Sequence, residues 1–112
     1  MPLADGESLH QYDSSAVETN ALARTGGGVL IEIVAILDPA ETTAQYLHLF
    51  DSIAAPSGAP DRRILVPAAG IFVYTPLGGW RFGTGLRVAF SSTLASHTAS
   101  STGGVFHVDM VS

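Results

Sequence analysis

Between residues 45 and 93, short apolar segments alternate with clusters of Pro and Gly at near-regular intervals. One cluster brings Pro56, Gly58 and Pro60 close together, and another is the run Pro76-Leu77-Gly78-Gly79. Proline fixes φ and removes a backbone donor, so these clusters cannot lie inside a helix or a strand. Apolar segments separated by turns about every ten residues are typical of β-strands. No segment has a convincing helical period, and only residues 40–46 offer a minor helical alternative.

The strongest strand signal is VLIEIVAIL at residues 29–37, which is rich in β-branched residues and ends at Asp38-Pro39. Both of its faces are largely apolar, which favours a central strand. Further strands are expected at residues 44–51, 63–66, 71–75, 80–82, 86–92 and 105–111, with a short one near 94–98. The spacing of residues 63–66 and 71–75 is that of a hairpin.

Parallel sheets need long crossovers, usually helical, and this chain has no segment for them. We therefore expect an all-β fold, a small antiparallel β-sandwich or barrel of about six to eight short strands. Residues 1–25 lack a sustained period and precede Gly26-Gly27-Gly28. We expect them to form an N-terminal arm or lead-in segment, and residues 26–112 to form a single β-sandwich domain.

The charge balance argues against two classes of partner. The chain has no Lys, and its five basic residues face ten acidic ones, a net charge of −5. Nucleic-acid binding is not expected, since it needs clustered Lys and Arg. No membrane partner is expected either, because no apolar run approaches the length of a membrane-spanning helix, and the first residues lack the pattern of an export signal.

Nothing in the sequence resembles a catalytic centre. Four histidines, His10, His48, His97 and His107, lack metal-binding spacings and are interpreted as ordinary surface or interface residues. There is no Cys and no GxSxG motif, and the Gly clusters read as turns. We therefore predict no catalytic, cofactor-binding or metal-ligating residue, no cofactor, and a protein that is not an enzyme.

Two charged residues stand inside strongly apolar strands. Glu32 and Arg87 would be costly if they were buried without a partner. An ion pair between them across neighbouring strands is one hypothesis, and simple exposure of both to water is the alternative.

The compact cluster Trp80-Arg81-Phe82 combines residue types that are enriched at interface hot spots. Packing of Trp80 at the edge of the sandwich is the alternative, and a carbohydrate site on Trp80 is a weaker one. Together with apolar positions of the expected arm, the candidate interface consists of Leu9, Tyr12, Val17, Trp80, Arg81 and Phe82.

The order of three segments carries a resemblance: QYLHLFDS, then LVPAAG, then GWRFGTGLRVAFSST. The matching positions are Phe50-Asp51, residues 55–60, residues 66–70, and Phe82, Gly85, Leu86, Ala89, Ser91, Ser92 and Thr93. With this order the chain resembles small β-rich virion structural proteins of tailed bacteriophages, the decoration (cement) proteins among them. Ile71 departs from the pattern, because a second Gly is common there. The resemblance covers about half of the chain and concerns turns and strands.

The resemblance implies a capsid decoration protein on the capsid surface of the virion, present in the host cytoplasm during assembly. Its partner would be the major capsid protein, and a closed homo-oligomer, with a trimer favoured, would be the natural form. Removal of residues 1–25 would then weaken attachment and leave the sandwich folded. A tail, neck or fibre-associated virion module and a carbohydrate-binding adhesive β-module are the alternatives.

Overall fold

The structure is a computed structural model that describes residues 8–68 and 70–112. Within these residues there is no helix, so none could span a membrane. The described residues form nine strands: β1 (Leu9–Asp13), β2 (Asn20–Thr25), β3 (Gly28–Leu37), β4 (Gln45–Phe50), β5 (Arg62–Val66), β6 (Ile71–Tyr74), β7 (Trp80–Phe82), β8 (Gly85–Ser91) and β9 (Gly104–Val111). The all-β prediction is confirmed.

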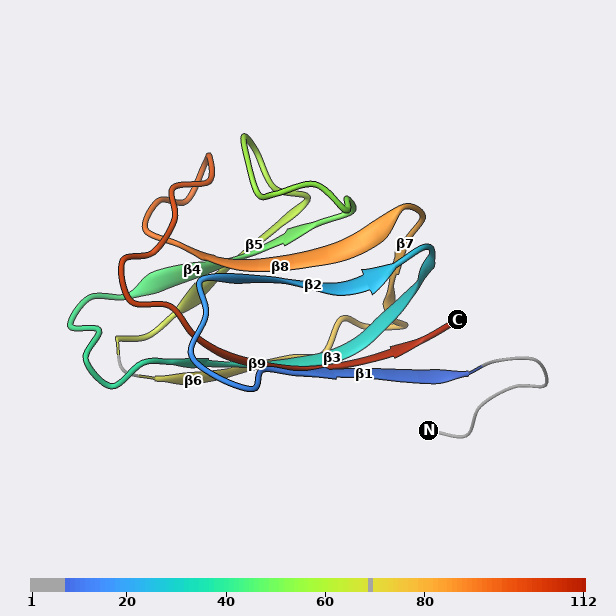
Figure 1. The fold of residues 1–112 in the computed structure, drawn as a ribbon, viewed down its shortest axis with the longest axis horizontal. Helices are drawn as coiled ribbons and strands as arrows, with labels where there is room; N and C mark the ends of the chain where they lie inside the picture. Colours follow the sequence, from blue (N-terminus) through green and yellow to red (C-terminus); the bar gives the residue numbers. More distant parts are fainter. Residues whose placement is uncertain (1–7, 69) are drawn as a thin grey trace.

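The strands form two antiparallel sheets that face each other (Figure 1). The sheet that we call sheet A has the order β1-β9-β3-β6, with β7 also paired to β3. The other, sheet B, has the order β2-β8-β4-β5. This arrangement is consistent with the predicted small sandwich. The strand at residues 29–37 is central as expected, because β3 pairs with β9 along one edge and with β6 and β7 along the other.

The core lies between the sheets and is built from alternate residues of their strands. In β3 and β9 the buried residues recur at every second position, apart from a bulge between Leu30 and Glu32. Phe90 of sheet B and Phe106 of sheet A are fully buried, and their rings stack with centroids 4.5 Å apart. This stacked pair ties the two sheets together at the centre of the core.

In its described part, the segment expected as an N-terminal arm or lead-in segment is not a free arm but forms a strand of each sheet. β1 pairs with β9 along its whole length, and β2 pairs with β8. Ala21 of β2 belongs to the core. Residues 8–25 therefore supply an edge strand to each sheet, and their removal would take strands out of the sandwich. Residues 1–7 of the expected arm lie outside the described residues.

Two local expectations are also wrong. Residues 94–98 form no strand: residues 94–96 are bends, and residues 97 and 98 have no regular structure. β5 and β6 are not a hairpin, because β5 pairs with β4 in sheet B and β6 pairs with β3 in sheet A. The connection after Val66 therefore crosses from one sheet to the other, and the short spacing that suggested a turn within one sheet is a link between two.

Candidate functional site

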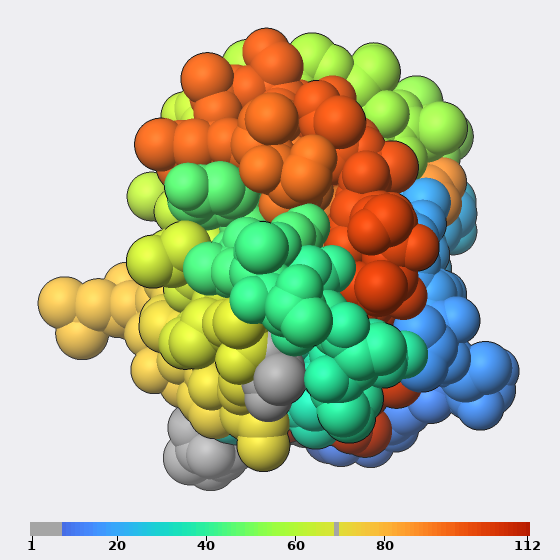
Figure 2. Space-filling view, turned by 90° about the vertical axis from the view of Figure 1, so that its left-hand side faces the viewer, coloured from blue at the N-terminus to red at the C-terminus, as the bar shows by residue number. Residues whose placement is uncertain are grey.

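The two sheets differ on the side that faces away from the core. Above sheet B lie two loops, residues 51–61 and residues 92–103, which come together at the top of the molecule (Figures 1 and 2). The backbone N–H of His97 joins them by donating to Gly58 O at 2.7 Å. In Figure 1 no loop of the described residues covers sheet A in the same way, so its outer side chains are open to a partner.

The strand register sorts the outer side chains of sheet A into cross-strand rows. Val34 lies opposite both Val73 and His107, and Ile36 lies opposite both Ile71 and Val105. Five of these residues form a continuous surface that we call the aliphatic patch: Val34, Ile36, Ile71, Val73 and Val105. Ile71 is 63% exposed and Val73 is 51% exposed. Val34, Ile36 and Val105 are partly exposed. Single exposed aliphatic residues are ordinary, whereas a contiguous group on a sheet face is a candidate interaction surface.

An acidic border runs beside the aliphatic patch. Glu32 of β3 lies opposite Asp109 of β9, which lies opposite Gln11 of β1. Gln11 Nε2 donates to Asp109 Oδ1 at 3.0 Å, while Glu32 has no hydrogen-bond or ion-pair partner within the described part of the chain. Like charges directly opposite each other on a sheet are unfavourable. A basic group from a partner would relieve this repulsion.

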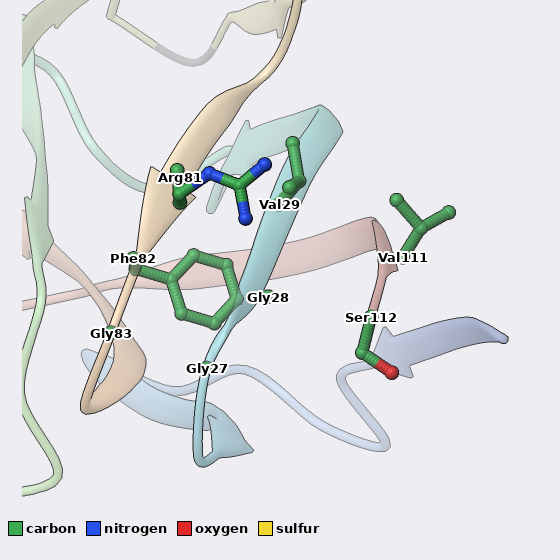
Figure 3. A pocket seen from close by; sticks show the side chains of 8 residues that line it. All are labelled: Gly27, Gly28, Val29, Arg81, Phe82, Gly83, Val111 and Ser112. Atoms are coloured by element: carbon green, nitrogen blue, oxygen red, sulfur yellow. The ribbon is translucent and has the colours of Figure 1, made fainter. Parts of the chain in front are cut away.

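Arg81 stands at the other end of the same face, beside an open hollow of about 500 Å³ (Figure 3). The Phe82 ring lies close to Gly28 on one side of the hollow, and Val111 and Ser112 lie on the other. A second hollow of about 360 Å³ shares Arg81 and lies against the β6–β7 turn. The hollows contain few polar side chains, so they suit contact with a surface better than capture of a small polar molecule.

Strand alternation divides the predicted Trp80-Arg81-Phe82 cluster. Trp80 and Phe82 turn inward: Phe82 is buried in the core, and the half-buried Trp80 packs against it. The guanidinium of Arg62 lies 5.8 Å from the centre of the Trp80 ring. Only Arg81 faces outward. The alternative of Trp80 packing at the sandwich edge therefore describes its position, and the ring is not an open platform for a sugar.

The three candidate interface residues from the N-terminal segment also separate. Leu9 is exposed at the end of an outer row of sheet A, opposite Val111. Tyr12 packs against the core and its hydroxyl donates to Glu18 Oε2 at 2.5 Å. Burial, together with the Glu18 carboxylate, raises the pKa of Tyr12 to about 12. Val17 is exposed in the connection between β1 and β2.

The hypothesis of a Glu32–Arg87 ion pair is wrong. Glu32 is on the outer face of sheet A and Arg87 is in sheet B. The Arg87 guanidinium donates to Ile53 O at 2.8 Å, to Ala54 O at 3.1 Å and to Asn20 Oδ1 at 3.2 Å. It therefore holds the loop of residues 51–61 against sheet B, a role that its position in the sequence does not reveal.

The structure contains one polar cluster that the sequence did not predict. His97 of the loop of residues 92–103 is in ring contact with His48 of β4, and Arg63 donates to Leu94 O and Ala95 O beside them. The two histidines are 49 positions apart, so no spacing rule joins them. Among the described residues no group of three or more His, Cys, Asp or Glu side chains could hold a metal ion.

No family model, no curated protein and no solved structure matches this chain.

Proposed function

We propose that this protein is a non-enzymatic structural component of a tailed-phage virion, a decoration protein that attaches to the major capsid protein through the outer face of sheet A. The observation that carries the attachment surface is the aliphatic patch beside its acidic border, on the sheet that no loop within residues 8–68 and 70–112 covers. The segment order QYLHLFDS, LVPAAG and GWRFGTGLRVAFSST supports the assignment to a virion.

The chemistry of this face defines its partner. Interfaces between folded proteins commonly have an apolar centre and a polar rim. Here the patch supplies the apolar centre, and Glu32, Asp109 and Asp13 supply an acidic rim. A matching capsid surface would present aliphatic side chains to the patch and Arg or Lys to the carboxylates. Charge complementarity of this kind fixes the register of docking more than it adds affinity.

We also propose that the protein assembles on the capsid surface as a closed homo-oligomer, with a trimer favoured. The role is mechanical: each bound copy adds interfaces between shell subunits, with no reaction. A tail, neck or fibre-associated module would use the same face against another virion protein. The sugar-binding alternative loses its main argument, because the inward-facing Trp80 is not free to stack on a glycan.

Binding to capsids that lack the protein tests the proposal. We expect cryo-EM to show added density on the outer shell at local threefold axes. Val73→Asp should lower occupancy at least about tenfold, which corresponds to about 1.4 kcal/mol of binding free energy. The matched control is Leu65→Asp, because Leu65 is 55% exposed but belongs to sheet B. Circular dichroism confirms that both variants are folded.

The outcomes separate the alternatives. Density at the tail vertex alone would replace decoration with a tail module. No density anywhere would contradict a virion role on the shell. Equal loss of occupancy for Val73→Asp and Leu65→Asp would contradict the choice of sheet A as the attachment surface.

A further inference from the structure

We infer that the loop of residues 92–100 opens in response to protons: several hydrogen bonds hold it over sheet B, the one between His48 and His97 depends on the protonation state of both rings, and protonation of both rings opens the loop. This inference is independent of the proposed function, since it concerns the opposite sheet. It rests on four groups, which we call the latch: His48, His97, Arg63 and the carbonyl of Leu94.

The geometry places both imidazoles in defined hydrogen bonds. His48 is 0% exposed on β4, and its Nδ1 lies 3.2 Å from His97 Nδ1. Its other nitrogen, Nε2, lies 3.1 Å from Leu94 O. Arg63 Nε also donates to Leu94 O at 3.1 Å, and Arg63 Nη2 donates to Ala95 O at 3.1 Å. The latch residues therefore hold the loop through hydrogen bonds at Leu94, Ala95 and His97.

These contacts determine where the protons are. A carbonyl oxygen only accepts, so His48 Nε2 carries a hydrogen and donates to Leu94 O. In the neutral ring, His48 Nδ1 then has a lone pair and needs a donor. His97 must supply it from Nδ1–H. His97 is thus held in the Nδ1–H tautomer, which is the less common form of a free imidazole.

Additional protons act on the latch in two steps. A first proton can enter at His97 Nε2 and leave the shared hydrogen bond intact, although it places a cation beside buried groups and near Arg63. A second proton, on His48 Nδ1, would face the hydrogen of His97 Nδ1. The hydrogen bond is then lost, and two imidazolium cations repel each other next to the Arg63 guanidinium.

In the described part of the chain, no carboxylate contacts either ring. β5 contributes Arg63, β4 contributes Phe50, and β8 contributes Ala89 opposite His48. Apart from His97, the loop of residues 92–100 has no titratable side chain. The other loop has Asp51 and Asp61, whose carboxylates accept backbone N–H groups of residues 83–85 and of Asp51 respectively.

The direction of the pH response follows from the closed state. Burial, the neighbouring His97 and Arg63 lower the pKa of His48 to about 4, and burial lowers the pKa of His97. In the open loop both rings would titrate near the ordinary value of about 6.5. The closed state therefore has its full stability relative to the open state above pH ~6.5, and this stability decreases as the pH falls toward 4. The open-to-closed ratio rises about tenfold per pH unit for each ring.

Opening would display a surface that is hidden at neutral pH. Phe50 and Ala89 are buried on the outer side of sheet B: Ala89 of β8 lies opposite His48, and Phe50 is two residues further along β4. Their exposure would give sheet B an apolar outer face comparable to that of sheet A. The loop of residues 51–61 has its own attachment through Arg87, so it would remain in place when the latch opens.

Two measurements on the intact protein test the latch. The first is the ¹⁵N spectrum of the histidine rings at pH 7.5. We expect protonated Nε2 and unprotonated Nδ1 for His48, and protonated Nδ1 for His97. The opposite tautomer of His97, or an unprotonated Nε2 in His48, would overturn the inference without any substitution.

The second is hydrogen exchange of loop amides, corrected for intrinsic rates, at pH 7.5 and 5. The amides of His97, Ser92 and Thr98 are hydrogen-bonded in the closed loop. Their opening ratio should rise at least about ninetyfold, because one ring with an open-state pKa of about 6.5 contributes about thirtyfold and the second ring adds at least about threefold, while amides in β3 and β9 stay unchanged. His97→Gln keeps a side-chain donor but binds no proton, so its rise should be at least about threefold smaller.

His107→Gln is the matched control, because His107 is an exposed histidine of sheet A. It should retain the full rise. An equal rise in the wild type, His97→Gln and His107→Gln would show that the His48–His97 pair does not control the loop. A rise in β3 and β9 as large as that in the loop would replace local opening with global acid unfolding.

Discussion

The outer faces of the two sheets differ in how far the rest of the described chain covers them. On sheet B, two loops cover the face, and residues such as His48 and Ala89 are completely buried there. The polar groups beneath the loops are used within the chain, as when Arg87 binds the carbonyls of Ile53 and Ala54. On sheet A, aliphatic residues remain exposed and Glu32 is left opposite Asp109. One face serves the stability of the chain, and the other is available to a partner.

Placing the same charge on each face gives the largest expected difference. Ala89→Asp puts a carboxylate under the loops of sheet B, where Ala89 is 0% exposed. We expect the free energy of unfolding to fall by more than about 3 kcal/mol, because the carboxylate would be desolvated and the Arg63 and Arg87 guanidiniums on this face already donate to loop carbonyls. Val73→Asp on sheet A, where the side chain is 51% exposed, should cost less than about 1 kcal/mol.

Urea denaturation of both variants measures this difference. Similar losses for Ala89→Asp and Val73→Asp would mean that the two faces are equally covered. A loss confined to Ala89→Asp would support the difference in cover and would also show that Val73→Asp is folded well enough for the capsid-binding test.

Removing Arg87, which holds the loop of residues 51–61 against sheet B, should have a smaller effect on the free energy of unfolding. Arg87→Met keeps the apolar stem and deletes the donors to Ile53 O, Ala54 O and Asn20 Oδ1. Charged hydrogen bonds are worth about 1.5–3 kcal/mol each, but water can replace part of these at the loop edge, so we expect a total loss of about 2 kcal/mol.

The matched control is Arg81→Met on the outer face of sheet A, where the guanidinium makes no hydrogen bond among the described residues. Its effect on stability should stay within about 0.5 kcal/mol. Denaturation curves give both values, and hydrogen exchange of residues 51–61 should increase only in Arg87→Met. An equal effect of the two substitutions would remove the claimed role of Arg87.

The sequence pattern located most strands because alternation and turn residues are local signals. The segment 29–37 was expected to be a central strand and is one, and residues 80–82 form the short β7. Pairing was harder to predict. β5 and β6 are separated by a turn-length segment, yet they lie in different sheets, because partner choice depends on the whole core rather than on the connection.

The candidate site was less accessible from the sequence for a related reason. Whether an apolar side chain is covered depends on loops that are distant in the chain. The two apolar faces of residues 29–37 were visible, but only the structure shows that one of them is left uncovered. Likewise, Trp80 and Arg81 are neighbours in the sequence but point to opposite sides of sheet A, as alternation along a strand requires.

The smallest expected effect concerns an ion pair on the uncovered face. His107 Nδ1 and Asp13 Oδ1 are only 2.6 Å apart, but the two side chains are 50% and 65% exposed. Exposed pairs are screened by water and lose side-chain entropy, so His107→Gln should change the free energy of unfolding by no more than about 0.5 kcal/mol. Urea denaturation at low and at high salt measures this contribution. A loss of unfolding free energy above about 1 kcal/mol that persists at high salt would mean that water does not reach the pair. The outer face of sheet A would then be covered in solution, and the two sheets would not differ in the way described.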